Sequence, residues 1–266
     1  MKVRNLFFTV AALSAICTQA ATFECGGLYY TTTSANSVAV ARVPAEKATN
    51  NPYKGVYIIP EQVFYDGANY QVTAIADSAF FQSKATEVQV PNTVTTIGEC
   101  AFAYATDLAN ITLPLHLKDV SKMLLAGTNV VNVAVPEGVK TIGWGAFQSC
   151  PMLHTMLLPS TTKRIDAYGY NNCHNLFEIY CAAPTAPEAS GWAIFIGLSG
   201  IDVIVPDDDA VAKYAANAVW GDESTFTLYP SEEVSISMTG EVEKYNDHYM
   251  RFALGNNLAY KIYKGD

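Results

Sequence analysis

Residues 139–159 read VKTIGWGAFQSCPMLHTMLLP, and this stretch recurs upstream in the chain. A near-copy occupies residues 94–114, VTTIGECAFAYATDLANITLP, and a fainter copy occupies residues 72–91, VTAIADSAFFQSKATEVQVP. Each copy opens on Val-x-x-Ile, carries an Ala-Phe pair and ends on a short apolar run closed by proline. Because such self-similarity marks a repeat architecture, we expect the remaining residues to be variants of this unit or caps on it.

The repeat has a period of 22 to 23 residues. The apolar residue that opens the turn recurs at Ile75, Ile97, Val120, Ile142 and Ile165. Strand-like segments follow at the same interval, at residues 88–91, 111–114, 133–136, 156–159, 179–182 and 203–206. Side chains alternate along a strand, so Val133 and Val135 should face the core, and the closing proline, which lacks an N–H, should end the pairing.

Stacking these units predicts the fold. Each strand should lie beside its equivalent in the next unit, which gives a parallel sheet, while the Ile-Gly-x-x-Ala-Phe segment returns the chain on the other side. Phe80, Phe102 and Phe147 should then stack as an interior aromatic ladder. We therefore predict a strand-dominated α/β solenoid in which neighbouring units bury each other's apolar faces.

Composition excludes two broad classes of protein. The chain has 266 residues, of which half are hydrophobic, so it can bury a substantial core and is not a disordered protein. Its 16 Lys and Arg against 25 Asp and Glu give a net charge of -9, which lacks the excess of basic residues that binding to DNA or RNA requires. We therefore expect no nucleic acid among the partners.

The flanking regions carry other patterns. Residues 1–20 have a basic start, an apolar stretch at 6–16 and small residues before a cleavage site after Ala20, as in a signal peptide. Cys17 leaves a lipoprotein alternative, and no stretch is long enough for a transmembrane span. We expect an antiparallel β cap over residues 21–70, with a hairpin turn at Asp66-Gly67-Ala68-Asn69. The solenoid should follow over residues 71–230, ending in a short helix at 210–218, and then a β segment over residues 231–266.

The repeat resembles a known family. Residues 142–153 read IGWGAFQSCPML and carry every fixed position of the BspA-type leucine-rich repeat of bacterial surface proteins. The tail YCAAPTAP at residues 180–187 and the hairpin at residues 65–73 are similar to the ends of such arrays. The unit at residues 120–136 departs from the pattern, since it lacks the Gly, the Ala-Phe pair and the Cys. The resemblance implies a right-handed superhelix and a role in adhesion or protein binding.

Five cysteines remain after the expected cleavage. The position three residues after the aromatic is always small, and Cys150 and Cys173 fill it in adjacent units. Buried free thiols are one interpretation of this pair, and a disulfide along the stack is the other. Cys181 occupies a position that aliphatic residues fill in other strands, so we interpret it as core.

Two features could bind a partner. The outward strand positions become apolar toward the C-terminus, ending with Leu157, Tyr180 and Ile204. This row should form either an exposed patch that binds a partner or a surface that the segment after residue 233 folds back to cover. Trp144 stands where other units place Asp77, Glu99, Lys122 and Ala167, which indicates an exposed ring that could stack on a sugar or anchor a protein.

No pattern indicates catalysis. The four histidines do not fall at metal-ligand spacing, and there is no Gly-x-Ser-x-Gly, phosphate loop or His-Glu-x-x-His. We therefore expect no metal, no cofactor and no enzymatic activity. The predicted function is protein binding or adhesion at the cell surface, outside the cell or in the periplasm. Glycan binding and a purely structural scaffold are the alternatives.

Overall fold

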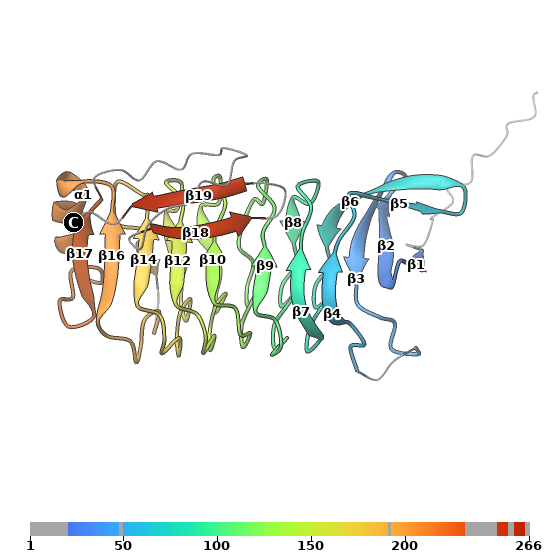
Figure 1. Ribbon diagram of the computed structural model, residues 1–266, viewed down its shortest axis with the longest axis horizontal. Coiled ribbons are helices and arrows are strands. Elements are labelled where there is room, and N and C mark those ends of the chain that lie inside the picture. Colours follow the sequence, from blue (N-terminus) through green and yellow to red (C-terminus); the bar gives the residue numbers. More distant parts are fainter. Residues whose placement is uncertain (1–20, 48–49, 191–192, 232–248, 255–257, 264–266) are drawn as a thin grey trace, which may run out of the picture.

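The structure is a computed structural model that describes residues 21–47, 50–190 and 193–231, together with two strands at Tyr249–Leu254 and Leu258–Tyr263. The signal peptide predicted for residues 1–20 lies outside the described residues, as does much of the segment predicted for 231–266. Within the described part, strands run across a long solenoid and one helix stands near its C-terminal end (Figure 1).

Parallel strands form the long face of the solenoid. In spatial order they are β4 (Lys54–Ile58), β7 (Lys84–Gln89), β9 (Asn110–Thr112), β10 (Asn132–Ala134), β12 (Thr155–Leu158), β14 (Glu178–Cys181), β16 (Ile201–Val205) and β17 (Phe226–Pro230). Pairing runs from β4 to β9 in one sheet and from β10 to β17 in the next, and every pair is parallel. The predicted strand-dominated solenoid with a parallel sheet is confirmed.

A second set of strands lines the opposite side. They are β6 (Ala68–Ile75), β8 (Thr96–Ile97), β11 (Thr141–Ile142), β13 (Arg164–Asp166) and β15 (Glu188–Ser190). The apolar residues that set the period lie in register here: Ile75 pairs with Ile97, and Ile142 pairs with both Val120 and Ile165. Ile142 is fully buried, so the row that defines the repeat in the sequence is one continuous line of the core.

The N-terminal strands are mostly antiparallel. β1 (Thr22–Cys25), β2 (Leu28–Ser34) and β3 (Ser37–Ala41) form a meander, and β3 then pairs in parallel with β6. β5 (Gln62–Tyr65) joins β6 in the expected antiparallel hairpin, but the turn is only Asp66-Gly67 because Ala68 and Asn69 already pair with β5. Through β6, this sheet passes directly into the returning strands of the solenoid.

An aromatic ladder fills the interior. The ring of Phe80 lies 5.1 Å from that of Phe102, and those of Phe147 and Tyr170 are 5.4 Å apart, as centroid distances. Leu125 interrupts the row, since its N–H bonds to Ala146 just as the N–H of Phe147 bonds to Gly169. The ladder therefore has the predicted members, and its one break falls in the unit that lacks the Ala-Phe pair.

Large side chains close both ends of this ladder. Tyr53 lies 4.8 Å from Phe80 at the N-terminal end, while Phe195 extends the row beyond Tyr170 and meets Trp220 at 5.3 Å. Trp220 is fully buried, and its Nε1–H donates to the Pro187 carbonyl at 2.9 Å. The core is thus sealed before residue 231.

The helix α1 (Asp208–Ala215) lies against β17 at this end. It begins two residues earlier than predicted because Asp207 caps it, accepting a hydrogen bond from the Ala210 N–H at 2.8 Å. Buried Tyr214 projects from the helix and donates to the Cys181 sulfur and the Ala183 carbonyl. Burial raises the pKa of the Cys181 thiol to about 11.

The returning segment uses a left-handed backbone at two positions in each unit. These have φ near +60° and are the rows Ser78, Cys100, Met123, Gly145, Tyr168 and Ala193, and Gln82, Tyr104, Gly127, Ser149, Asn172 and Gly197. Gly143 meets a different constraint: a Cβ there would lie 2.7 Å from the Val120 carbonyl oxygen and 2.9 Å from the Lys122 nitrogen. It is needed because the backbone of the preceding unit passes close by.

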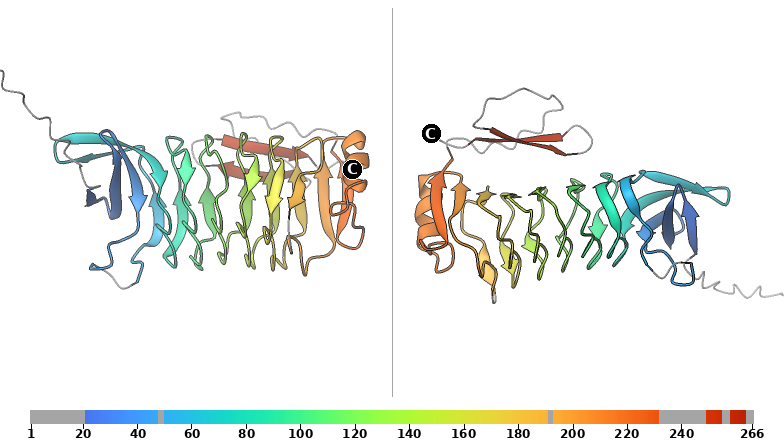
Figure 2. Two further views of the ribbon diagram at one scale, coloured as in Figure 1. Left: turned by 180° about the vertical axis from the view of Figure 1, so that it is seen from behind. Right: turned by 60° about the horizontal axis from the view of Figure 1, so that its bottom comes forward.

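The last two strands, β18 (Tyr249–Leu254) and β19 (Leu258–Tyr263), form an antiparallel hairpin that is a separate two-stranded sheet. Figures 1 and 2 show this hairpin crossing the outer face of the sheet over β10, β12 and β14. It makes no ladder with that sheet, so it lies over the face as a second layer.

Gly143→Ala should destabilise the protein by about 1–3 kcal/mol, because the new methyl group meets backbone rather than a movable side chain. Gly145→Asn is the matched control: its φ of +59° suits Asn, and five equivalent positions already hold other residues, so the loss should stay below about 1 kcal/mol. Urea unfolding measures both. Equal losses would contradict the close approach at Gly143.

The stability of the protein should fall between pH 9 and pH 11 under reducing conditions. The unfolded Cys181 thiol ionises near pH 8.5–9, whereas the folded one keeps its proton to about pH 11, so the folded state binds more protons in this window. Raising this pKa from 9.0 to about 11 contributes about 3 kcal/mol of stability, which is present below pH 8.5 and lost by pH 11. Cys181→Val, the residue found at equivalent position 135, should show a shallower decline. Identical pH profiles for the two proteins would contradict this.

Candidate functional site

The outer face of the long sheet carries the candidate interaction residues. Strand register aligns outward positions within each sheet: Ile58, Gln89 and Thr112 in the first, and Ala134, Leu157, Tyr180, Ile204 and Tyr229 in the second, which together we treat as one row. The second outward row runs beside it through Val56, Glu87, Asn110, Asn132, Thr155, Glu178, Asp202 and Thr227. The first row is apolar over β10 to β16, and we call its four residues Ala134, Leu157, Tyr180 and Ile204 the apolar strip.

The apolar strip is buried, although it points away from the solenoid core. Leu157 is 7% exposed, Tyr180 5% and Ile204 0%, so the expectation that this row forms an exposed patch does not hold in this structure. Ile58, in the same row but at its N-terminal end, is 70% exposed. The reason for the difference is position, because the β18–β19 hairpin lies over β10 to β14 and far from β4 (Figure 2).

The polar residues beside the strip are also engaged. Thr112, Thr155, Glu178, Asp202 and Tyr229 all point outward on this face, and each takes part in a polar, electrostatic or ring contact. The Tyr180 hydroxyl donates to Glu178 at 3.5 Å, and burial raises the pKa of this tyrosine well above its ordinary value. A face with buried outward residues and satisfied polar neighbours is an occupied interface.

The N-terminal end of the same face is open. Val56 is 60% exposed and Ile58 70%, and within the described residues β4 has a strand partner only on its β7 side. A shallow pocket of about 230 Å³ adjoins Ile58, formed by residues 58–61 and 89–91. The repeat period does not predict this patch, because residues 54–58 precede the first unit and lie in the predicted N-terminal cap.

Trp144 lies on the returning side, within a surface row that links units. It is 38% exposed; the ammonium of Lys122 lies 5.7 Å from its ring centroid, and the ring of Tyr168 lies 5.3 Å from it. These neighbours come from the preceding and the following unit, and Lys122 also pairs with Glu99 at 4.0 Å. The structure therefore does not bring Trp144 together with the apolar strip, and it gives the ring a packing role between units.

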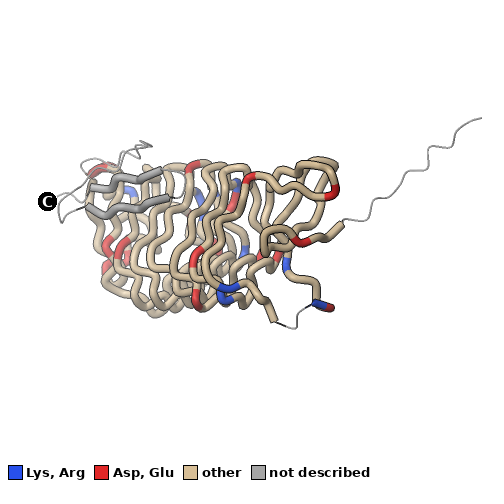
Figure 3. Tube along the Cα trace, turned by 45° about the vertical axis from the view of Figure 1, so that its right-hand side comes forward, with Lys and Arg blue, Asp and Glu red and all other residues tan. Residues whose placement is uncertain are grey.

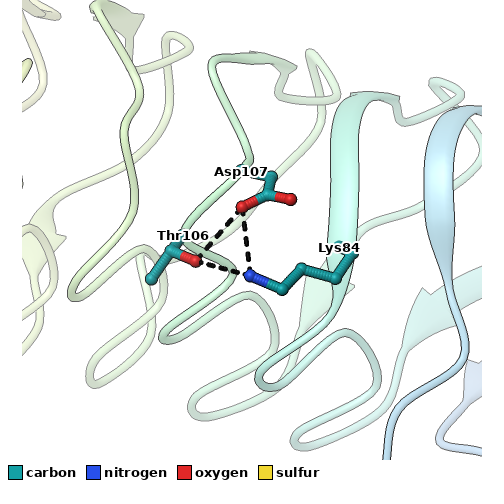
Figure 4. A network of polar contacts seen from close by, with 3 residues as sticks. All are labelled: Lys84, Thr106 and Asp107. Atoms are coloured by element: carbon teal, nitrogen blue, oxygen red, sulfur yellow. Dashed lines mark hydrogen bonds and ion pairs between the residues drawn. The ribbon is translucent and has the colours of Figure 1, made fainter.

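Polar contacts also tie units together at the surface. The Lys84 ammonium, at the start of β7, donates to Thr106 Oγ1 and Asp107 Oδ1, both at 3.1 Å, and Thr106 donates to Asp107 (Figure 4). These side chains are about half exposed, so the ion pair contributes at most about 1 kcal/mol. Basic and acidic residues are otherwise scattered along the described chain without a basic stripe (Figure 3).

The disulfide considered for Cys150 and Cys173 is absent: both thiols are free and fully buried. The thiol of Cys150 donates to the Leu125 carbonyl at 3.1 Å and that of Cys173 donates to the Phe147 carbonyl at 3.0 Å. Each thiol thus bonds to the backbone of the unit before it. The hydrogen bond with Cys150, together with burial, raises the pKa of the Cys173 thiol, which keeps it protonated.

The remaining chemistry is sparse. Over the described residues, no group of three His, Cys, Asp or Glu side chains could hold a metal ion, and no helix is long and apolar enough to cross a membrane. His248 lies outside the described residues. A pocket of about 420 Å³ lies between α1 and β17, with Val211, Trp220, Phe226 and Leu228 in its wall. Trp220 and Phe226 in this wall are also residues that seal the core.

Comparisons with known proteins support the repeat. The family model for the BspA type leucine rich repeat region matches six copies over residues 73–186. A search of curated proteins finds no match.

Solved structures with a similar chain include a leucine-rich repeat protein from T. pallidum, with 25% identity, a TM-score of 0.48 and coverage of 57% of this chain and 67% of that one. A leucine-rich repeat protein from Bacteroides ovatus has 20% identity and a TM-score of 0.38, covering 70% and 66%. A leucine-rich cell surface protein from Faecalibacterium prausnitzii has 18% identity and a TM-score of 0.43, covering 73% and 72%.

The family match agrees with the register seen here, because its residues include the aligned row from Ile75 to Ile165 and the ladder from Phe80 to Tyr170. The six matched copies identify residues 73–186 of this chain as a BspA type leucine rich repeat region.

Proposed function

We propose that this chain is an exported, non-enzymatic repeat protein that binds a protein partner at or outside the bacterial cell surface. The observation that carries the proposal is the apolar strip. Leu157, Tyr180 and Ile204 point away from the core, so stacking of the units does not require them to be apolar. Equivalent positions in the N-terminal half hold Gln89 and Thr112, which shows that the same architecture accepts polar residues there.

The chemistry of the strip suits a protein rather than a small molecule. Four aligned side chains on consecutive strands form a flat apolar row, bordered by Thr155, Glu178 and Asp202 on the second outward row. An apolar centre with a polar rim is the usual anatomy of a protein interface, and tyrosine is enriched in such centres. A row of side chains on a sheet face lacks the concave shape of a small-molecule site.

A glycan at Trp144 has weaker support. Stacking on a sugar needs a free ring face, whereas Lys122 and Tyr168 approach this ring from the units on either side. We therefore place the binding function on the sheet face and give Trp144 the role of a surface link between units.

The full chain should bind at least one member of a panel of extracellular matrix proteins with a saturable signal in biolayer interferometry. Leu157→Gln should weaken that binding at least tenfold, equivalent to about 1.4 kcal/mol, because it places an amide in the apolar centre. Thr112→Gln, in the same row but outside the strip, should change it less than twofold.

On glycan arrays we expect no binding that is lost in Trp144→Ala but kept in Tyr104→Ala. Tyr104 is the matched control because it is also an exposed aromatic residue. Binding confined to glycans and lost in Trp144→Ala would contradict the proposal and favour the glycan-binding alternative. If Leu157→Gln and Thr112→Gln weaken protein binding equally, the apolar strip is not the binding surface.

A further inference from the structure

The C-terminal hairpin is amphipathic by its register. Residues directly opposite each other on antiparallel strands share a face, and the pairs alternate between the two faces. One face of the hairpin carries Met250, Phe252, Leu254, Leu258, Tyr260 and Ile262. The other face carries Tyr249, Arg251, Ala253, Ala259, Lys261 and Tyr263. All six residues of the first face are apolar or aromatic, whereas the second face includes two cations placed directly opposite each other.

Such a ribbon does not support itself. An isolated two-stranded hairpin is at best marginally stable in water, and it gains stability by packing its apolar face on another surface. Within the described chain, β18 and β19 pair only with each other, so backbone pairing with the solenoid does not hold them. Burial of the six-residue apolar face is therefore the main force available to place the hairpin.

The solenoid presents a surface of matching character under it. The apolar strip is buried, Figures 1 and 2 draw the hairpin across β10 to β14, and the row is open again at Ile58. The solenoid core does not need this cover for closure, because Tyr214, Trp220 and Phe226 seal it before residue 231. The hairpin and the solenoid therefore form separate sheets, and each has its own apolar surface.

We propose that the β18–β19 hairpin docks on the apolar strip through its apolar face and occupies the partner-binding surface in cis, so that a protein partner binds by displacing it. This rests on the function proposed above. The partner that fits is one that presents an extended strand or ribbon with apolar side chains at alternate positions, since the strip accepts that pattern from the chain itself.

Tethering gives the internal occupant an advantage over any free competitor. Docking within one chain proceeds at an effective concentration on the order of mM. The apparent partner affinity is reduced by the fraction of molecules in which the strip is open. A variant that weakens docking should therefore bind the partner more tightly than the wild-type chain does, which is the opposite of what loss of a binding residue would cause.

Phe252→Asp in the full chain tests the docking face, and Ala253→Asp is the matched control, with the same new side chain one position along on the opposite face. Phe252→Asp should raise anilinonaphthalene sulfonate fluorescence several-fold by exposing the strip. It should also allow a synthetic peptide of residues 249–263 to bind, as measured by fluorescence polarisation. Ala253→Asp should resemble the wild-type chain in both assays.

A second pair, Tyr260→Asp against Ala259→Asp, repeats the comparison on the other strand in case the first variant does not fold. Equal dye and peptide signals within both pairs, whether high or low, would overturn the proposal. The two proposals fail separately. If the dye and peptide signals differ within the pairs but no protein partner binds, only the proposed binding function is contradicted. If a partner binds and Phe252→Asp does not strengthen that binding, only the proposed occupancy of the strip by the hairpin is contradicted.

Discussion

Each unit of this solenoid is too short to bury its own apolar residues, and every other feature depends on this constraint. Ile142 is buried because Val120 and Ile165 lie on either side of it, and Phe147 because Leu125 and Tyr170 do. Equivalent side chains must therefore recur at a fixed interval. Where the array stops, something other than a further unit must cover the exposed rung, and Tyr53 and Trp220 do so at the two ends.

The features that repeat could be predicted from the sequence, because stacking turns a period along the chain into a row in space. The line of Ile75, Ile97 and Ile142, the aromatic ladder and the buried Cys181 all follow from that argument. Features that occur once could not be found this way. Phe195 and Trp220 lie beyond the last clear copy of the unit, so no equivalent residue pointed to their place in the core.

The candidate site shows the same limit. The alternation of strand residues correctly places Leu157, Tyr180 and Ile204 on the outer face, but whether that face meets solvent depends on a segment far along the chain that has no periodic relation to the repeat. The face consequently has two ends of different character, one covered over β10 to β16 and one open at Val56 and Ile58. Stacking of the units explains why the inner residues of every strand are apolar. It does not constrain the outer residues in this way, so these are the positions that can serve binding.

The most direct test of the stacking account removes one unit in register. Deleting residues 120–141, which are 22 residues, joins Asp119 to Ile142 and lets Ile142 take the place of Val120 in the row. The account predicts a shorter protein that still unfolds in one cooperative urea transition, because each rung keeps a complete neighbour. Deleting only residues 120–130 should abolish that transition, since it places a strand against a returning segment. If the two deletions behave alike, the units are not the stacked, interchangeable elements described here.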